Sequence, residues 1–257
     1  MTYLEELLAS TRVRIEDLRA TVTDDAMDQR ISSMPPPRGF KAALSGRDVA
    51  IVAEIKRSSP SKGALNENLD AAGIARSYAQ GGAAAISVLT VPDGFGGSID
   101  DLRAAMPAGP PLLRKDFILD PFQILESRAE GADAVLLIVR ILGAEFASLY
   151  TLAKALGMDA LVEVFDESDL ERAAEAGADM IGINHRDLET FEVDPDRTAK
   201  LAPQVPPEMV VVGLSGVETR ADVERLADAG AHAVLVGETL VTADDPVAKL
   251  RELRGVA

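Results

Sequence analysis

The sequence contains no cysteine, and this absence excludes several kinds of chemistry at once. Disulfides, thiolate metal ligands and thiol nucleophiles all need cysteine. The chain also has only two histidines, His185 and His232, and His232 opens a predicted strand rather than following one. We therefore expect no metal site, and nothing indicates a disulfide-stapled secreted protein.

Aromatic residues and positive charge are also scarce. Aromatics make up 4% of the chain and tryptophan is absent, so a core must rest on aliphatic side chains. The formal net charge of −16 argues against a nucleic-acid partner, because phosphate backbones are bound by basic faces. Residues 1–6 lack the basic start of a signal peptide, and the best apolar run, residues 134–139, is far too short to span a membrane. We expect a cytoplasmic protein without a membrane partner.

A repeated unit organises most of the chain. Four times an Ala-rich segment ends at a Gly-Ala pair, and a β-branched apolar run begins at once, with the glycines at positions 82, 131, 177 and 230. Such glycines are typical of helix C-caps in the left-handed conformation. Further apolar runs lie at residues 49–55, 111–114, 160–164 and 209–213.

These runs amount to eight strands separated by helices. The strands are continuously apolar rather than alternating, as parallel strands covered on both faces are. The pattern predicts an α/β fold, a (β/α)8 barrel of the TIM type, with an open doubly wound sheet as the alternative. Residues 2–31 show helical spacing of leucine and isoleucine, prolines 35–37 interrupt it, and a short helix is expected at 40–44. We expect one domain, residues 1–257, with a helical extension (1–48) before the barrel (49–257).

Charged residues stand at the carboxyl ends of alternate predicted strands. Glu54 and Lys56 follow the first, Lys115 the third and Glu163 the fifth. Because alternate strands of such a barrel contribute to the same interior layer, the four could converge. Each could simply reach solvent at a strand end, but four charges on matching strands favour a site whose members shift one another's pKa values.

The loops after the last two strands carry small residues. Ser215-Gly216 follows the seventh strand and Gly237 the eighth, each just before a helix. In (β/α)8 barrels these two loops often hold phosphate through backbone N–H groups, and glycine allows a close approach. Two such loops in matching positions predict a phosphorylated small-molecule substrate.

Five motifs at the strand ends resemble those of the indole-3-glycerol phosphate synthase family. They occupy residues 53–61 (Ala-Glu-Ile-Lys-Arg-Ser-Ser-Pro-Ser), 95–98, 113–118, 161–164 and 183–188. The resemblance runs in order from about residue 40 to the C-terminus, and the first motif is the most specific. One position departs from the family, which usually has Glu before the Ser-Gly of the seventh strand, where this chain has Leu214.

The resemblance implies a lyase of tryptophan biosynthesis. The substrate would be 1-(2-carboxyphenylamino)-1-deoxyribulose 5-phosphate, which closes to indole-3-glycerol phosphate with loss of carbon dioxide and water, without a cofactor. Lys115 and Lys56 are the candidates for the general acid, and Glu163 for the group that assists dehydration. Glu54 and Asn184 would orient the reacting groups.

The same resemblance implies a set of substrate-binding residues. The anthranilate ring would lie in an apolar slot, its carboxylate near Ser59, and Arg186 would hold Asn184 and the substrate. Phosphate would be bound largely by backbone N–H groups with help from Arg57, and the Glu238 side chain is expected to point away from it. The slot is assigned to Pro60, Phe95, Phe117, Leu136 and Leu188, and the phosphate loops to Ser215, Gly216, Gly237 and Glu238.

Two other functions remain as alternatives. A related phosphate-binding barrel, phosphoribosylanthranilate isomerase, relies on a cysteine general base, which this chain lacks. A non-catalytic barrel that binds a phosphorylated ligand has only Leu214 in its favour, because a binding protein has no need of paired acids and bases. The oligomeric state is left open, and a monomer is compatible with the sequence.

Overall fold

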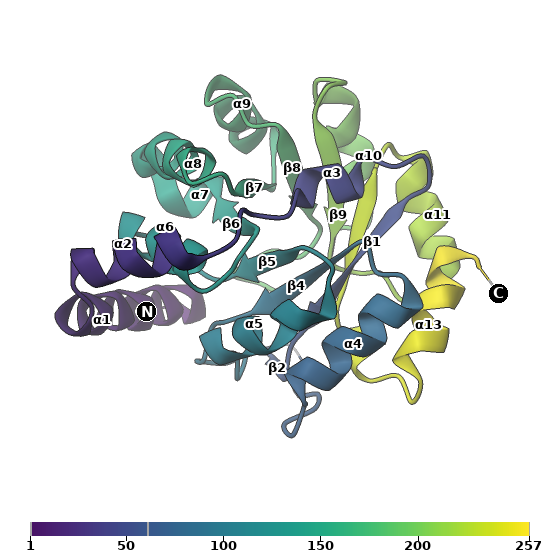
Figure 1. Ribbon diagram of the computed structural model, residues 1–257. Helices are drawn as coiled ribbons and strands as arrows, with labels where there is room; N and C mark the ends of the chain where they lie inside the picture. Colours follow the sequence, from purple (N-terminus) through teal and green to yellow (C-terminus); the bar gives the residue numbers. More distant parts are fainter. Residues whose placement is uncertain (1, 61, 257) are drawn as a thin grey trace.

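Eight parallel strands form a closed barrel in the computed structural model, which describes residues 2–60 and 62–256 (Figure 1). Each strand pairs with its neighbours in sequence order, and β1 closes the barrel against β10. The predicted (β/α)8 barrel is therefore confirmed, and the open sheet is excluded. The barrel strands are β1 (Ala50–Ile55), β4 (Ala85–Leu89), β5 (Leu112–Lys115), β6 (Ala134–Ile138), β7 (Asp159–Val164), β8 (Met180–Asn184), β9 (Val210–Leu214) and β10 (Ala233–Val236).

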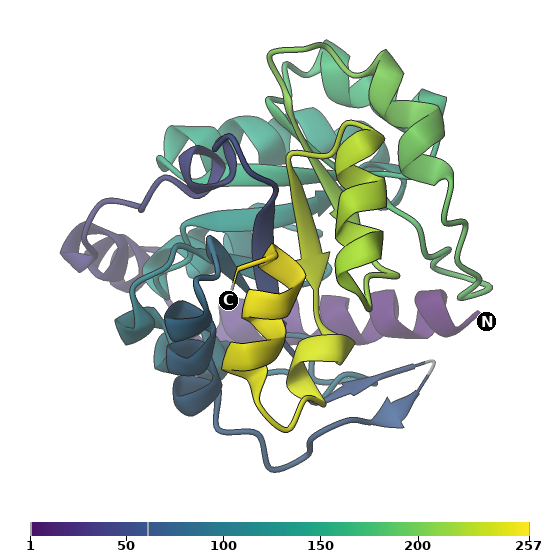
Figure 2. The same ribbon diagram turned by 90° about the vertical axis from the view of Figure 1, so that its right-hand side faces the viewer.

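Helices surround the strands, and a short hairpin projects from the loop after β1 (Figures 1 and 2). The hairpin consists of β2 (Ser58–Ser59) and β3 (Gly63–Ala64), whose intervening Ser61 lies outside the described residues. No helix in the described residues is long and apolar enough to cross a membrane. The barrel helices are α4 (Ala71–Gly81), α5 (Ile99–Ala105), α6 (Pro121–Ala129), α7 (Val139–Leu142), α8 (Phe146–Ala155), α9 (Glu167–Glu175), α10 (Arg197–Leu201), α11 (Arg220–Asp228), α12 (Glu238–Val241) and α13 (Pro246–Arg254), with 3-10 turns η1 (Met106–Ala108), η2 (Gly143–Glu145) and η3 (Ala202–Gln204).

The glycines that end the repeated helices all adopt the predicted left-handed conformation. Gly82, the C-cap of α4, has a φ of 84°, and its counterparts Gly131, Gly177 and Gly230 have φ values of 87°, 74° and 100°. A side chain with a Cβ is strained there, so glycine permits the sharp turn from helix to strand.

Alternate residues of each strand face opposite layers. In β1, Ile51, Ala53 and Ile55 pack in the cluster between strands and helices, whereas Val52 belongs to the cluster inside the barrel. Glu54 follows the interior alternation, as predicted, and Ala53 and Ile55 point outward. The same alternation on β5 sends Leu113 and Lys115 inward.

The amino-terminal ends of the strands are sealed by α3 (Phe40–Leu44). Phe40 and Leu44 are fully buried in the interior cluster, and the Lys41 N–H donates to Asp159 at 2.8 Å. Arg38 donates to both oxygens of Asp133, which also accepts the Leu112 N–H at 2.7 Å. These contacts stabilise the amino-terminal end of the barrel, and the candidate active site lies at the opposite end.

The N-terminal extension forms two helices, α1 (Tyr3–Thr21) and α2 (Asp24–Ser33), so the helical range predicted as 2–31 extends two residues further. A capping box between Thr2 and Glu5 begins α1. Leu7 of α1 packs into the interior cluster, and the Tyr3 ring meets the Phe191 ring edge to face at 5.8 Å between centroids. The first half of α1 therefore packs against loops at the carboxyl ends of the strands, whereas α2 packs against α6.

Candidate active site

A cavity of about 590 Å³ lies at the carboxyl ends of the strands. Residues from the ends of all eight barrel strands or their loops line it. Of the residues predicted for the site, Arg57 and Pro60 alone do not line it, and the others do: Glu54, Lys56, Ser59, Phe95, Lys115, Phe117, Leu136, Glu163, Asn184, Arg186, Leu188, Ser215, Gly216, Gly237 and Glu238.

Two lysines share one buried carboxylate at the centre of the cavity. Oε2 of Glu54 lies 3.1 Å from Nζ of Lys115, and Oε1 lies 3.4 Å from Nζ of Lys56. Burial alone would raise the pKa of Glu54, but the charges of Lys115 and Lys56 outweigh it and hold that pKa below its ordinary value. Glu54 is therefore a carboxylate at neutral pH.

Lys115 remains protonated in spite of its environment. Burial pulls its pKa down, and Arg186 adds to that, but the negative charges of Glu54 and Glu163 raise the pKa above its ordinary value. The side chain is an ammonium group in a site with limited access to water. It can donate a proton to an oxygen that gains negative charge.

Glu163 has the opposite character. It is 1% exposed, and burial raises its pKa above the ordinary value although Lys115 acts against this. Its Oε1 accepts a hydrogen bond of 3.0 Å from Nδ2 of Asn184. Two carboxylates with pKa values shifted in opposite directions can take different roles in acid–base chemistry.

Asn184 is held in one orientation by its own neighbours. Its Oδ1 accepts hydrogen bonds from the Ser215 hydroxyl at 2.9 Å and from the Arg186 N–H at 3.0 Å. These donors identify Oδ1 as the acceptor end, so the Nδ2 donor points to Glu163. The amide thereby links the loop after β9 to the buried carboxylate.

Apolar side chains from several strands and the loops after them line the cavity, and together they are called the apolar wall. The predicted Phe95, Phe117, Leu136 and Leu188 line it, together with residues that the sequence analysis did not assign: Leu89, Val91, Ile138, Phe191, Leu214 and Leu235. Strand alternation could have identified Leu89 and Ile138, because both occupy interior positions. Phe191 lies in the loop after β8 and had no sequence signal.

The two phosphate-loop candidates lie next to each other. Ser215 and Gly216 both have positive φ values, 70° and 79°, and the Thr239 hydroxyl donates to the Val217 carbonyl at 2.8 Å across the two loops. Gly237 leaves no room for a side chain, because a Cβ there would lie 2.4 Å from Oε1 of Glu54 and 3.0 Å from Nζ of Lys56. Both loops therefore border the charged centre.

The Glu238 carboxylate is paired with Lys62 rather than left against the loops. Its Oε1 lies 3.5 Å from Nζ of Lys62, which lies in the turn between β2 and β3. Both side chains line the cavity, and the direction of Glu238 relative to a bound phosphate stays a prediction.

Arg57 is where the structure differs from the sequence analysis. Its guanidinium forms an ion pair with Asp101 of α5, with one contact of 2.8 Å, and donates to the Leu69 carbonyl at 3.0 Å. These interactions hold it behind the loop after β1, so it is not directed at the phosphate loops. Pro60 lies in the hairpin turn, outside the apolar wall.

The two histidines lie apart from each other, at opposite ends of the barrel. His185 is buried behind the Ser215 loop, where Nδ1 lies 2.9 Å from the Ser215 carbonyl and Nε2 lies 2.7 Å from the Thr198 hydroxyl. His232 is exposed at the start of β10. The described residues contain no group of three or more His, Cys, Asp or Glu that could bind a metal.

Leu214 fills the position of the family's usual glutamate with apolar bulk. It is 2% exposed inside the barrel, and its side chain lies close to a glycine of the adjacent strand β8. A Cβ on that glycine, Gly182, would lie 2.9 Å from Cδ1 of Leu214. Leucine at position 214 therefore adds an apolar side chain to the cavity lining and leaves Ser215 and Gly216 in place.

Comparison with known proteins identifies the group to which this architecture belongs. The family model for indole-3-glycerol phosphate synthase matches residues 4–253. The chain belongs to the indole-3-glycerol phosphate synthase family. The proteins of that name from Dehalococcoides mccartyi and Mycolicibacterium vanbaalenii are 45% and 46% identical to it, over 97% and 98% of this chain and 99% and 93% of their own lengths.

Indole-3-glycerol phosphate synthase 2 of Streptomyces coelicolor is 47% identical, with 98% of each chain covered. The predicted family and enzyme class, a carbon–carbon lyase of tryptophan biosynthesis, are thus confirmed. Among solved structures, 3-hexulose-6-phosphate synthase from Salmonella typhimurium superposes with a TM-score of 0.65 at 17% identity, covering 80% of this chain and 97% of that chain. At this identity the likeness shows the barrel fold alone.

Proposed function

We propose that the cavity closes the indole ring of 1-(2-carboxyphenylamino)-1-deoxyribulose 5-phosphate, with Lys115, Lys56, Glu54, Glu163 and Asn184 as the reacting and orienting groups. The observation that carries this proposal is the pair of buried carboxylates with opposite pKa shifts on either side of a protonated lysine. A barrel that only bound a phosphorylated ligand would have no use for this arrangement.

The first step needs a proton donor at the ribulose carbonyl. As the carboxylate-bearing ring carbon attacks C2, the carbonyl oxygen gains negative charge and takes a proton from Lys115, becoming a hydroxyl. Lys115 suits this role because Glu54 and Glu163 keep it protonated until the substrate oxygen competes for the proton. Lys56 lies beside Gly237 as well as Glu54, so its charge also faces the phosphate end of the substrate.

The later steps need a base. Loss of carbon dioxide returns the C–C bonding electrons to the ring system, so the substrate supplies its own electron sink and no cofactor is required. Dehydration then removes a proton and the new hydroxyl. Glu163 accepts the proton, since burial makes it a stronger base than an exposed carboxylate, and passes it to the departing hydroxyl, which leaves as water; Asn184 holds the carboxylate in place.

The two ends of the substrate match the two sides of the cavity. The anthranilate ring lies against Phe95, Phe117, Leu136 and Leu188. Its carboxylate accepts a hydrogen bond from the Ser59 hydroxyl, which is buried without a hydrogen-bond partner among the described residues. The phosphate oxygens accept hydrogen bonds from backbone N–H groups of the Ser215–Gly216 and Gly237–Glu238 loops.

Turnover of the synthetic ribulose phosphate tests the proposal. The wild-type protein alone, without added metal or cofactor, should produce indole fluorescence from this substrate. Binding of the substrate without any fluorescent product would favour the non-catalytic barrel and overturn the proposal. We extend the proposal to a single catalytic domain acting in the cytoplasm on this small molecule.

A further inference from the structure

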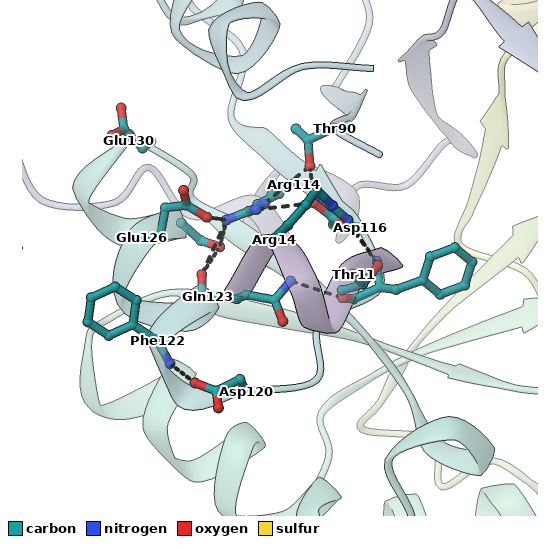
Figure 3. Close-up of polar contacts among 12 residues, drawn as sticks. Thr11, Arg14, Thr90, Arg114, Asp116, Asp120, Phe122, Gln123, Glu126 and Glu130 are labelled. Atoms are coloured by element: carbon teal, nitrogen blue, oxygen red, sulfur yellow. Dashed lines mark hydrogen bonds and ion pairs between the residues drawn. The ribbon is translucent and has the colours of Figure 1, made fainter. Parts of the chain in front are cut away.

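A buried carboxylate stands directly behind the proposed general acid. Asp116 follows Lys115 in the chain, and its side chain is completely inaccessible to solvent. Its Oδ2 accepts hydrogen bonds from the Thr90 hydroxyl at 2.7 Å and from Nη2 of Arg114 at 3.1 Å (Figure 3). Its Oδ1 accepts the Phe117 N–H at 2.9 Å and Nη2 of Arg14 at 3.2 Å.

This cluster is attached to the active-site segment at three consecutive residues. The Thr90 N–H donates to the Lys115 carbonyl at 3.0 Å, so Thr90 holds the backbone of Lys115 and the side chain of Asp116 together. Phe117, whose N–H is bound by Asp116, lines the apolar wall. The position of Asp116 therefore sets the backbone of the proposed proton donor and of one substrate-binding residue.

Two arginines from distant parts of the chain hold Asp116. Arg114 is 3% exposed and is anchored to α6 by Glu126 at 2.7 Å and by Ser127 at 3.1 Å. Arg14 comes from α1, 102 residues earlier, and Figure 3 shows it reaching from that helix to the carboxylate. Burial would raise the pKa of Asp116, but these two charges hold it below the ordinary value. The carboxylate is thus a fixed charged hub between α1, β5 and α6.

We propose that Asp116 is a positioning residue for the reaction, and that Arg14 of α1 is the part of its support that reaches it from outside the barrel. The inference rests on the proposed function, because it assumes that Lys115 donates the proton. A lysine is long and rotatable, so its reach to a substrate oxygen depends on a fixed backbone. A displacement of about 1 Å at such a group can lower a rate by roughly 10²-fold.

The chain offers a matched control for this idea. Arg19 lies on the same helix and forms an ion pair of 2.6 Å with Asp120, the N-cap of α6. Arg14→Met and Arg19→Met therefore each remove one ion pair between α1 and the segment after β5, with the same replacement. Only the Arg14 partner is adjacent to Lys115. Loosening of α1 as a whole would affect both variants alike.

The experiment measures kcat, KM and thermal unfolding of wild type, both variants and Arg14→Lys with the ribulose phosphate substrate. We expect kcat of Arg14→Met to fall about 10-fold, with KM changed less than kcat. Arg14→Lys retains a donor and a positive charge, and should recover to within about 3-fold of wild type. Arg19→Met should keep kcat within about 2-fold of wild type, and its unfolding temperature should fall less than that of Arg14→Met, because Asp120 is partly exposed whereas the Asp116 side chain is fully buried.

Three results would overturn the inference. Equal kcat values for Arg14→Met and wild type would show that α1 does not support Lys115 through Asp116. Equal losses in Arg14→Met and Arg19→Met would mean that docking of the helix is responsible. A loss in Arg14→Met that Arg14→Lys does not restore would exclude the charge contact as the cause. A wild-type protein without turnover would instead overturn the proposed function, and this inference with it.

Discussion

Nζ of Lys115 lies 3.1 Å from Oε2 of Glu54, and the two residues come from alternate barrel strands, β5 and β1. The lysine thereby keeps its proton, and the carboxylate keeps its charge, inside a largely apolar barrel. Each group is expensive to bury alone, so removal of either partner leaves an uncompensated charge. The Lys115–Glu54 contact therefore affects both the catalytic activity and the stability of the fold.

Glu54→Gln and Glu163→Gln should change stability in opposite directions. The folded pKa of Glu54 is lowered, so its ionised form stabilises the fold above its unfolded pKa, and this contribution is lost as the pH falls through the folded value. Glu54→Gln should therefore lower the free energy of unfolding at pH 7 by about 3 kcal/mol, because it removes the buried carboxylate that the partly buried Lys115 and Lys56 share.

The folded pKa of Glu163 is raised above 4.5, so burial of its ionised form costs stability once the pH rises through that folded value. Glu163→Gln should consequently be as stable as wild type or more stable at pH 7, while kcat falls by roughly 10²-fold and an intermediate before dehydration accumulates. Urea denaturation at pH 7 and pH 4 measures both differences. A Glu163→Gln protein that loses more stability than Glu54→Gln would contradict the assignment of the two carboxylates.

Gly237→Ala should impair catalysis without disturbing the barrel. The new Cβ would stand 2.4 Å from Oε1 of Glu54, so the Glu54–Lys56 pair must move. The φ of Gly237 is −116°, which alanine adopts without strain, and the damage should remain local. We expect kcat/KM to fall by at least about 10-fold.

Gly46→Ala provides the comparison, because its Cβ would meet nothing closer than 3.8 Å, far from the site. Steady-state kinetics and circular dichroism of the two proteins suffice. Activity of Gly237→Ala equal to that of Gly46→Ala would mean that Glu54 and Lys56 need not stand where they do.

A free anion should occupy the phosphate loops. Sulfate or phosphate soaked into crystals is expected against the N–H groups of Gly216 and Gly237, where the two loops meet. In solution, inorganic phosphate should compete with the substrate, raising the apparent KM at constant kcat. Anion density found only near Lys62 would count against this assignment.

Asp133→Asn should affect stability alone. Asp133 receives hydrogen bonds from Arg38 and from the Leu112 N–H at the end of the barrel opposite the cavity. Loss of its buried charge beside Arg38 should lower the free energy of unfolding by about 3 kcal/mol, with kcat within about 2-fold of wild type at 25 °C. Denaturant titration and turnover measure the two quantities; a large fall in kcat with intact stability would show coupling between the two ends.

Much of this architecture could be predicted from the sequence because parallel strands impose simple rules. Continuous apolar runs marked the eight strands, and alternation placed Glu54 on the interior face. Since active groups of such barrels gather at the carboxyl ends, knowing where each strand stops was enough to place Lys115, Glu163 and Asn184 around one cavity.

Contacts between side chains distant in sequence were beyond these rules. The family resemblance assigned Arg57 to the phosphate, but the Arg57 guanidinium forms an ion pair with Asp101, 44 residues away. From the sequence, Arg14 is only one of several polar residues on an amphipathic helix, and its partner Asp116 lies 102 residues further along the chain. Phe191 lies in a loop, where no hydrophobic periodicity indicates which side chains face the cavity. Each depends on how loops pack over the barrel, which spacing along the chain does not encode.

The central claim is that Lys115 donates the proton at the ribulose carbonyl, and Lys115→Met tests it most directly. Methionine retains most of the apolar stem but removes the proton and the charge. The protein should fold, and its kcat for the ribulose phosphate, followed by indole fluorescence, should fall by about 10²-fold or more. Lys56→Met is measured in parallel, because Lys56 shares Glu54. Turnover within a few-fold of wild type in both variants would contradict the acid–base account of this site.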